Sequence, residues 1–277
     1  MTTLFTIAAI GAAIVITLVI RSLVRKRRRT ELLTSPLPSE WEEAIAHDFP
    51  RYRAVPEEIK ERLGGCARIL AEEKSFEACG GLEEVTERMK ALICIQAALL
   101  IVNLPHHRFF PALKSILVYP GAFRDRGHRR FGIHAEDRGT VLGESWETGS
   151  VILSWDNCLA GARNADDGLN VVIHEFAHQL DQINGAADGL PVLSSGKAYR
   201  RWAEVFHREF EELVEDVNDG RGPKPLIDPY GATEPAEFFA VASETFFEES
   251  HELREEHPDL YEQLCQYYRL DPATWEE

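Results

Sequence analysis

Apolar residues follow different patterns in successive parts of this chain. The N-terminal part is almost continuously apolar, and residues 4–20 carry no charge. Residues 57–73 and 82–102 then place apolar side chains at helical spacing, which predicts two helices. The second contains a near-continuous apolar run at 91–102, which is too short to cross a membrane. We therefore expect a buried core helix there.

After Pro105 the pattern changes to short apolar runs separated by Gly, Pro, Asp and Asn. These runs predict the strands of a small sheet at 115–119, 139–142 and 150–155. Helical spacing then returns, and it predicts four further helices at 169–183, 198–217, 233–249 and about 258–268. The expected fold class is α+β, a mostly helical domain with a small sheet over residues 41–277.

The N-terminal apolar stretch is followed, and not preceded, by basic residues, which lie between residues 21 and 29 and before the first acid, Glu31. A cleaved signal peptide would carry its basic residues first. With the basic side chain at position 21 snorkelling, the stretch reaches about 21 residues, enough to span a bilayer core. We predict one N-terminal transmembrane helix with a basic cytoplasmic flank over 1–29 and a linker over 30–40. A signal peptide and an interfacial helix are the alternatives.

The composition of the chain limits the cellular compartment and the binding partners that we expect. The five cysteines are scattered, with no CxxC pair, which is typical of a reducing compartment and argues against a cysteine-built zinc site. The net charge is −16, and the part after residue 30 is more acidic still. Such a surface repels phosphate backbones, so we expect no direct nucleic acid binding.

A metal-binding pattern lies in the predicted helix 169–183. His174 and His178 are four residues apart, so their imidazoles lie one turn apart on the same helix face, as two ligands of a tetrahedral zinc site require. Glu175 is next to the first histidine, where its carboxylate would take a proton from a zinc-activated water. The alternative is a pair of histidines with only structural contacts.

A zinc peptidase needs a third protein ligand. In the HExxHxxGxxH class it is a nearby histidine, but here Asp181 and Asn184 occupy the Gly and third His positions. Glu237 is the candidate, because it lies near the start of a predicted helix among Phe and Ala residues, where an unpaired carboxylate would be costly. A glutamate favoured by the helix dipole is the alternative.

With these motifs the sequence resembles the zinc-dependent peptidases typified by Mlc titration factor A, which are bacterial glucose-regulated metallopeptidases. The similarity covers most of residues 40–277. Its matching stretches are GESW at 143–146, VILSW at 151–155, NVVIHEFAHQLD at 170–181, YGA at 230–232, EPAE at 234–237 and SETFF at 243–247.

The resemblance implies a zincin-like domain with one zinc ion per chain, held by His174, His178 and Glu237, with Glu175 as general base. It also implies His134 as a histidine associated with the metal, which would take the water position in a resting state. From the sequence alone His134 is a loop histidine.

The site also resembles the catalytic domain of anthrax lethal factor, in which a tyrosine lies seven residues before the glutamate ligand. Tyr230 has this position relative to Glu237, and its hydroxyl would stabilise the oxyanion. A loop tyrosine with a solvated hydroxyl is the alternative.

The implied function is an aminopeptidase-like zinc peptidase that acts on short peptides. The competing hypothesis is a regulatory protein that sequesters a transcriptional repressor, with zinc mainly structural. Family members are soluble, so the apolar N-terminus is an addition. It leads us to expect a single-pass protein of a bacterial inner membrane with its catalytic domain in the cytoplasm.

Overall fold

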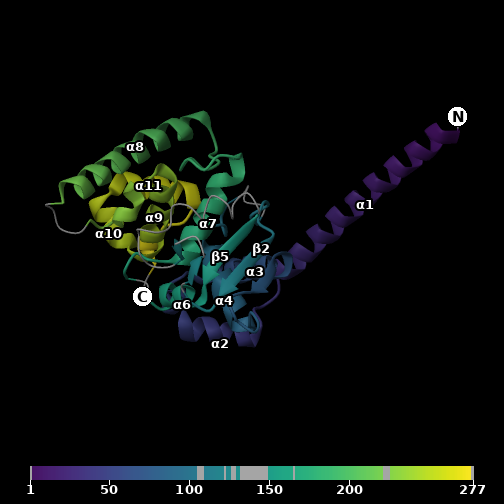
Figure 1. The fold of residues 1–277 in the computed structure, drawn as a ribbon, viewed down its shortest axis with the longest axis horizontal. Helices are drawn as coiled ribbons and strands as arrows, with labels where there is room; N and C mark the ends of the chain where they lie inside the picture. Colours follow the sequence, from purple (N-terminus) through teal and green to yellow (C-terminus); the bar gives the residue numbers. More distant parts are fainter. Residues whose placement is uncertain are drawn as a thin grey trace.

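The computed structural model describes residues 2–104, 109–121, 123–125, 129–131, 149–164, 166–220 and 225–275, except for the side chains of 2–4, 7–9, 123–125 and 129–131. In this part, helices pack against a small parallel sheet, and one long helix projects from the domain (Figure 1). The expected α+β class with a helical majority is confirmed. The predicted strand 139–142 and His134 lie outside the described residues.

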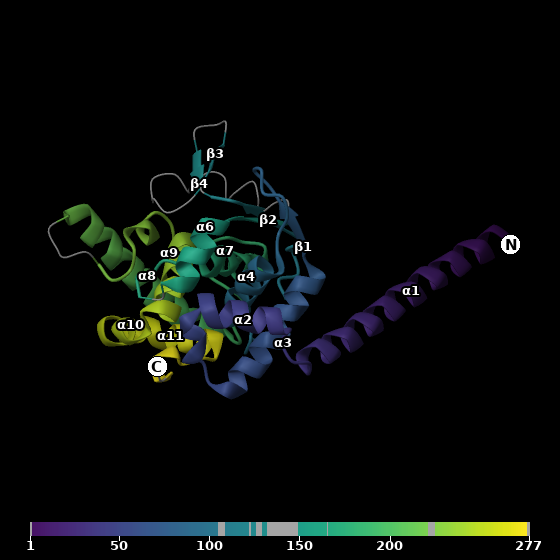
Figure 2. The same cartoon turned by 90° about the horizontal axis from the view of Figure 1, so that it is seen from below.

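Helix α1 (Thr2–Leu33) is continuous from the projecting end into the domain (Figures 1 and 2). Its C-terminal part docks on α3 (Glu57–Glu73), where Arg28 Nη2 lies 2.6 Å from Glu72 Oε2 and Arg29 Nε lies 2.7 Å from Glu73 Oε1. The predicted linker 30–40 thus covers the last turn of α1 and the connection to α2 (Ser39–Asp48).

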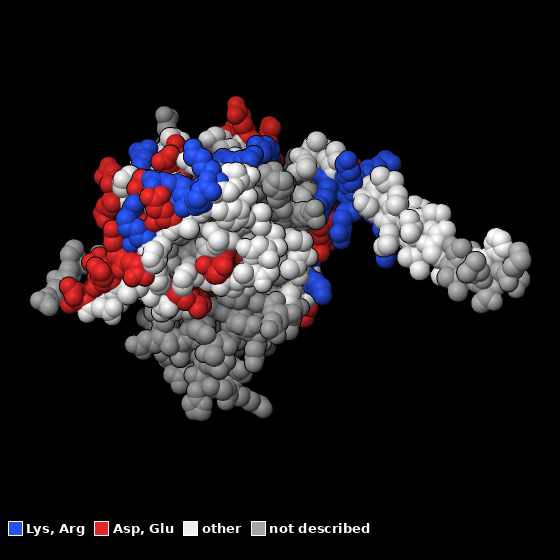
Figure 3. Space-filling view, turned by 90° about the horizontal axis from the view of Figure 1, so that it is seen from above, with Lys and Arg blue, Asp and Glu red and all other residues white. Residues whose placement is uncertain are grey.

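Close approach of the two helices depends on a glycine. A Cβ added at Gly65 in α3 would lie 2.6 Å from the Cα of Leu33, so a larger residue there would push α1 away. Figure 3 shows Lys and Arg gathered where α1 meets the domain.

The exposed large apolar side chains of the described residues lie mainly on α1, between Phe5 and Val24. Nevertheless, no helix in the described part of the chain has the length and apolar character needed to cross a membrane. The transmembrane anchor predicted from the sequence is therefore not confirmed.

Three parallel strands form the sheet in the order β1 (Ser75–Ala78), β2 (Ser115–Tyr119) and β5 (Ser150–Ser154). The predicted strands 115–119 and 150–155 are confirmed, but the second ends one residue earlier. Ser154 accepts a hydrogen bond from the backbone N–H of Asn157 and so caps α6 (Trp155–Arg163), which begins there. A separate antiparallel pair is formed by β3 (Phe123–Asp125) and β4 (Arg129–Phe131).

Helix α4 (Glu87–Leu99) is the buried core helix expected at 82–102, and its residues from Ala91 to Leu99 are all buried. It begins later than expected because the side chain of Thr86 accepts a hydrogen bond from the N–H of Met89. Helix α3 has the predicted bounds. The sequence pattern did not predict β1, α2, α6, the short helix η1 (Pro50–Arg53) or α10 (Ser250–Glu256).

The C-terminal half holds the remaining predicted helices, with ends shifted by a few residues. They are α7 (Val171–Asp181), followed by η2 (Gln182–Asn184), then α8 (Gly196–Asp219), α9 (Pro235–Glu248) and α11 (Pro258–Tyr268), with the short helices η3 (Pro229–Ala232) and η4 (Pro272–Thr274) between or after them. Trp202 stacks on Phe206 in α8 at 3.9 Å, and both rings contact Phe239 of α9. This aromatic packing fixes α9 against α8, while α7 packs on α9.

Candidate metal centre

Helix α7 places both histidines of the HExxH motif in the interior. Its first turn is capped by Asn170, whose Oδ1 accepts hydrogen bonds from the N–H groups of Val172 and Ile173, both at 3.1 Å. The short helix η2 continues directly from α7 and ends at Gly185, which adopts a left-handed conformation with φ of 91°. Between these ends, His174 and His178 lie on the same face and are both fully buried.

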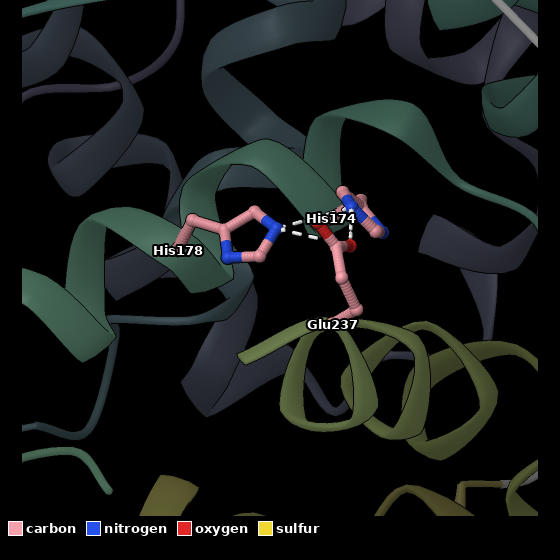
Figure 4. Close-up of side chains that lie close together, drawn as sticks. All are labelled: His174, His178 and Glu237. Carbon is pink, nitrogen blue, oxygen red and sulfur yellow. Dashed lines mark hydrogen bonds and ion pairs between the residues drawn. The ribbon is translucent and has the colours of Figure 1, made fainter. Parts of the chain in front are cut away.

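Helix α9 supplies the third side chain. Pro235 stands in its first turn, where the missing N–H costs nothing, and Glu237 follows in that turn. The neighbouring Phe238 and Phe239 are buried. Figure 4 shows Glu237 extending from α9 toward the two imidazoles of α7. The predicted third ligand, 59 residues from His178, is thus brought to the HExxH helix.

The three candidate ligand atoms have the spacing of a tetrahedral zinc site. Glu237 Oε2 lies 3.0 Å from His174 Nε2 and 3.4 Å from His178 Nε2, and the two Nε2 atoms are 3.2 Å apart. Zinc bonds of about 2.0 Å at tetrahedral angles put ligand atoms about 3.3 Å apart. The side chains therefore fit a zinc ion without rearrangement.

The charges of this cluster also require a cation. Nδ1 of His174 faces Glu244 Oε1 at 2.7 Å, so in the neutral imidazole the lone pair of Nε2 points at Glu237. Lone pairs of two imidazoles and a carboxylate oxygen would then converge and repel. Burial lowers the pKa of His174, but Glu244 and Glu237 outweigh it and raise the pKa to about 10 in the absence of metal. A metal ion bound by these three side chains would take the place of that proton.

Behind the ligands lies a buried network that the sequence analysis missed. Glu244, two turns after Glu237 in α9, accepts from the backbone N–H of Asn170 as well as facing His174. The side-chain amide of Asn170 donates to Glu248 Oε1 at 2.9 Å and to Gln96 Oε1 at 2.8 Å. Such outer partners orient the ligands and raise their basicity. The signal for them was visible as acids at a four-residue spacing in an otherwise apolar helix.

Glu248 is joined to this network through Asn170. Its Oε2 is buried without a hydrogen-bond partner in the described part of the chain. Burial raises the pKa of Glu248 well above its usual value, and the nearby carboxylate of Glu244 raises it further. The protonated form of Glu248 is thus favoured more than in a solvent-exposed glutamate.

The other predicted site residues have different outcomes. Glu175 is buried on the same turn of α7 as His174. Tyr230 is buried in η3, and its ring centroid lies 6.2 Å from that of His174, so the structure brings the tyrosine to the site. His134 lies outside the described residues, so its expected contact with the metal stays a prediction.

Comparison with known proteins agrees with this geometry. The sequence profile of the glucose-regulated metallo-peptidase M90 family matches residues 23–269. The chain belongs to the M90 family of metallopeptidases. The resemblance stated from the motifs is therefore confirmed, and the buried HxxxH pair with a distant glutamate is the metal-binding group of an M90 metallopeptidase.

Individual relatives of this M90 chain cover nearly the same length. An uncharacterized protein of Synechocystis sp. is 37% identical over 248 residues, which span 88% of this chain and 89% of that protein. Mlc titration factor A of Serratia proteamaculans is 30% identical over 241 residues, spanning 85% and 88%. Mlc titration factor A of Yersinia pestis is 29% identical over 241 residues, spanning 85% and 86%.

Proposed function

We propose that this M90 family member hydrolyses peptide bonds with one zinc ion held by His174, His178 and Glu237. The observation that carries the proposal is the convergence of three buried ligand atoms at 3.0, 3.2 and 3.4 Å. Zinc in such a site lowers the pKa of water toward neutrality and polarises the carbonyl of the substrate.

The residues of the chain perform the proton transfers. Glu175 accepts the proton of the attacking water and delivers it to the amine that leaves, because it lies beside a ligand without being one. The hydroxyl of Tyr230 donates to the developing oxyanion, a role supported by the closeness of its ring to His174. Glu244 holds the Nδ1–H of His174, which keeps its Nε2 directed at the metal position.

Substitution of the general base tests this proposal. We expect Glu175→Gln to bind about one zinc per chain and to keep the fold, but to lose at least about a hundredfold in peptidase activity. Metal analysis measures the bound zinc, and hydrolysis of short peptide p-nitroanilides measures the peptidase activity. His174→Ala serves as the control that loses zinc as well. Unchanged hydrolysis by Glu175→Gln would rule out the proposed mechanism.

Aminopeptidase-like specificity is the finer part of the proposal, and it rests on the family resemblance. Peptides with a free amino terminus should be cleaved at the first bond, whereas N-acetylated versions of the same peptides should be poor substrates. Cleavage of both at equal rates and at internal bonds would indicate an endopeptidase instead.

A second candidate function is the capture of a transcriptional repressor. The relatives named Mlc titration factor A support it by name, at 30% and 29% identity. On this proposal a purified repressor of the Mlc type binds the chain equally well after Glu175→Gln. Failure of the wild-type chain to retain the repressor would refute it, and it would leave the peptidase proposal untouched.

The cellular location stays a prediction from the sequence. The order of apolar and then basic residues in 1–29 is the feature behind the expected bacterial inner-membrane position. Fractionation of cells that express the full chain would test it.

A further inference from the structure

A second concave site, which includes none of the metal ligands, lies where the C-terminal end of the chain meets η1, the end of α6 and the start of α10. Figure 2 shows the C-terminus beside α10 and α11. The cavity has a volume of about 360 Å³ and is lined on its charged side by Arg51, Arg53, Arg163 and His251, which we call the basic pocket. Trp275 and Pro272 line its apolar side.

The arginines of the basic pocket are held in place by acceptors of the chain. Arg163 donates from Nε and Nη2 to Asp48 Oδ1 at 2.9 and 2.7 Å. Arg51 donates from Nη2 to the hydroxyl of Ser250 at 3.0 Å, and Arg53 donates from Nη2 to a backbone carbonyl at 3.2 Å. A guanidinium carries five N–H donors, so one fixed edge leaves donors on the other edges of Arg163 and Arg53 to meet a ligand.

A buried carboxylate keeps the pocket oriented. Asp48 is fully buried, and although burial raises its pKa, hydrogen bonds from His47, Arg163 and Arg88 lower the pKa to about 2. It is therefore ionised at neutral pH. The guanidinium of Arg163, whose side chain is 48% exposed, is thus held in place at the pocket.

Positive charge is in excess here, in a chain with a net charge of −16. Asp166 is the one acid among the residues that line the pocket. Asp48 below it is matched by Arg88, which lies outside the pocket. Among the described residues that line the pocket, three arginines stand beside this one acid.

We propose that the basic pocket binds a small organic phosphate. Guanidinium groups match the oxygens of a phosphate in fork geometry, and their charge-assisted hydrogen bonds are strong. The cavity is larger than a phosphate group, and the apolar side with Trp275 accommodates an organic part. A carboxylate carries half the charge of a phosphate monoester and offers fewer acceptor oxygens to the arginines.

Isothermal titration calorimetry on the purified full chain tests this proposal with three probes, inorganic phosphate, phenyl phosphate and benzoate. We expect phenyl phosphate to bind with the highest affinity, inorganic phosphate about tenfold more weakly and benzoate more weakly still. Affinity for the two phosphates should fall as the salt concentration rises.

The variant for this test is Arg53→Gln combined with His251→Gln, since both side chains are exposed and neither pairs with Asp48. We expect an affinity for phenyl phosphate at least about tenfold lower than in wild type. Arg200→Gln is the matched control, an exposed arginine of α8 outside the pocket, and it should bind like wild type.

Three outcomes would overturn the proposal. The first is the absence of saturable binding to wild type. The second is an affinity for phenyl phosphate that is equal in the double variant and in wild type. That result would mean that the measured heat of binding comes from phosphate bound at the metal centre. The third is equal affinity for inorganic and phenyl phosphate, which would mean that the pocket takes the free ion and has no place for an organic part.

Discussion

Two clusters of buried charge in this molecule are balanced in opposite ways. Asp48 is surrounded by cations of the chain, with Arg88 Nη2 at 2.6 Å and Arg163 Nη2 at 2.7 Å. Glu237 is equally buried, but its partners in the described residues are the two histidines. A buried carboxylate without an arginine or lysine needs a cation from elsewhere. The contrast separates a cluster that holds helices together from one that is built for a metal ion.

Removal of the third ligand should have the largest effect. We expect Glu237→Gln to lower zinc affinity by more than about a thousandfold and to abolish peptidase activity, because a neutral amide cannot balance the metal. Metal analysis after dialysis against a weak chelator measures the first effect.

Removal of the metal by a chelator also tests how much the metal stabilises the fold. Removal of zinc from the wild type by a strong chelator should lower its melting temperature, since a ligand that binds only the folded state stabilises it. The melting temperature of Glu237→Gln should not respond to chelator. If it responds as wild type does, the metal is held elsewhere.

Loss of the cluster around Asp48, whose charge is balanced by arginines of the chain, should lower stability and leave zinc in place. We expect Asp48→Asn to lower the free energy of unfolding by about 3 kcal/mol, because two arginines lose their buried anionic partner, while about one zinc per chain remains bound. Urea unfolding and metal analysis check the two parts. Loss of zinc in this variant would show that the two clusters are coupled.

The effect of Asp48 should also depend on pH in a defined direction. Hydrogen bonds from His47, Arg163 and Arg88 outweigh burial and lower its pKa to about 2 in the folded chain, against about 4 in the unfolded chain. Its contribution is therefore complete above about pH 4 and is lost as the pH falls toward 2. The difference between wild type and Asp48→Asn should shrink over that range. A constant difference would contradict the shifted pKa.

The acid behind His174 should have a smaller effect than the ligands. Glu244→Gln should weaken zinc binding by about tenfold to a hundredfold, because the amide no longer strengthens the imidazole as a donor. Competition titration with a zinc indicator gives the change. An unchanged zinc affinity would show that Glu244 serves only packing.

Glu248 should tolerate the same replacement. Because burial raises its pKa and so favours the neutral acid, Glu248→Gln should change zinc affinity by less than about twofold and stability by less than about 0.5 kcal/mol. Glu248→Ala, which removes the acceptor of the Asn170 amide, should lose more in both zinc affinity and stability. Equal losses in the two variants would contradict the raised pKa.

The sequence predicts those features that depend on local spacing. The four-residue interval between His174 and His178 fixes their common face, and most helices were placed within a few residues. Glu237 needed the family resemblance in addition, because its contact with α7 is formed only by the packing of two distant helices.

Tertiary pairing also explains what was missed. Strand β1 has only alternating weak signals, and its pairing with β2 defines it as a strand. Asn170 and Glu244 are ordinary polar residues until α7 and α9 come together. Asp48 gave no signal in the sequence, because its arginines come from positions 40 and 115 residues away.

Asn170 joins the first turn of α7 to the acid behind His174. Its side chain accepts from the first amides of the helix, and its backbone N–H donates to Glu244, which faces the imidazole. If that turn frays, the amide protons of Val172 and Ile173 become exchangeable with solvent, and the contact that supports the imidazole is weakened in the same event. We therefore expect hydrogen–deuterium exchange at these two amides and zinc dissociation to become faster together when the cap is weakened.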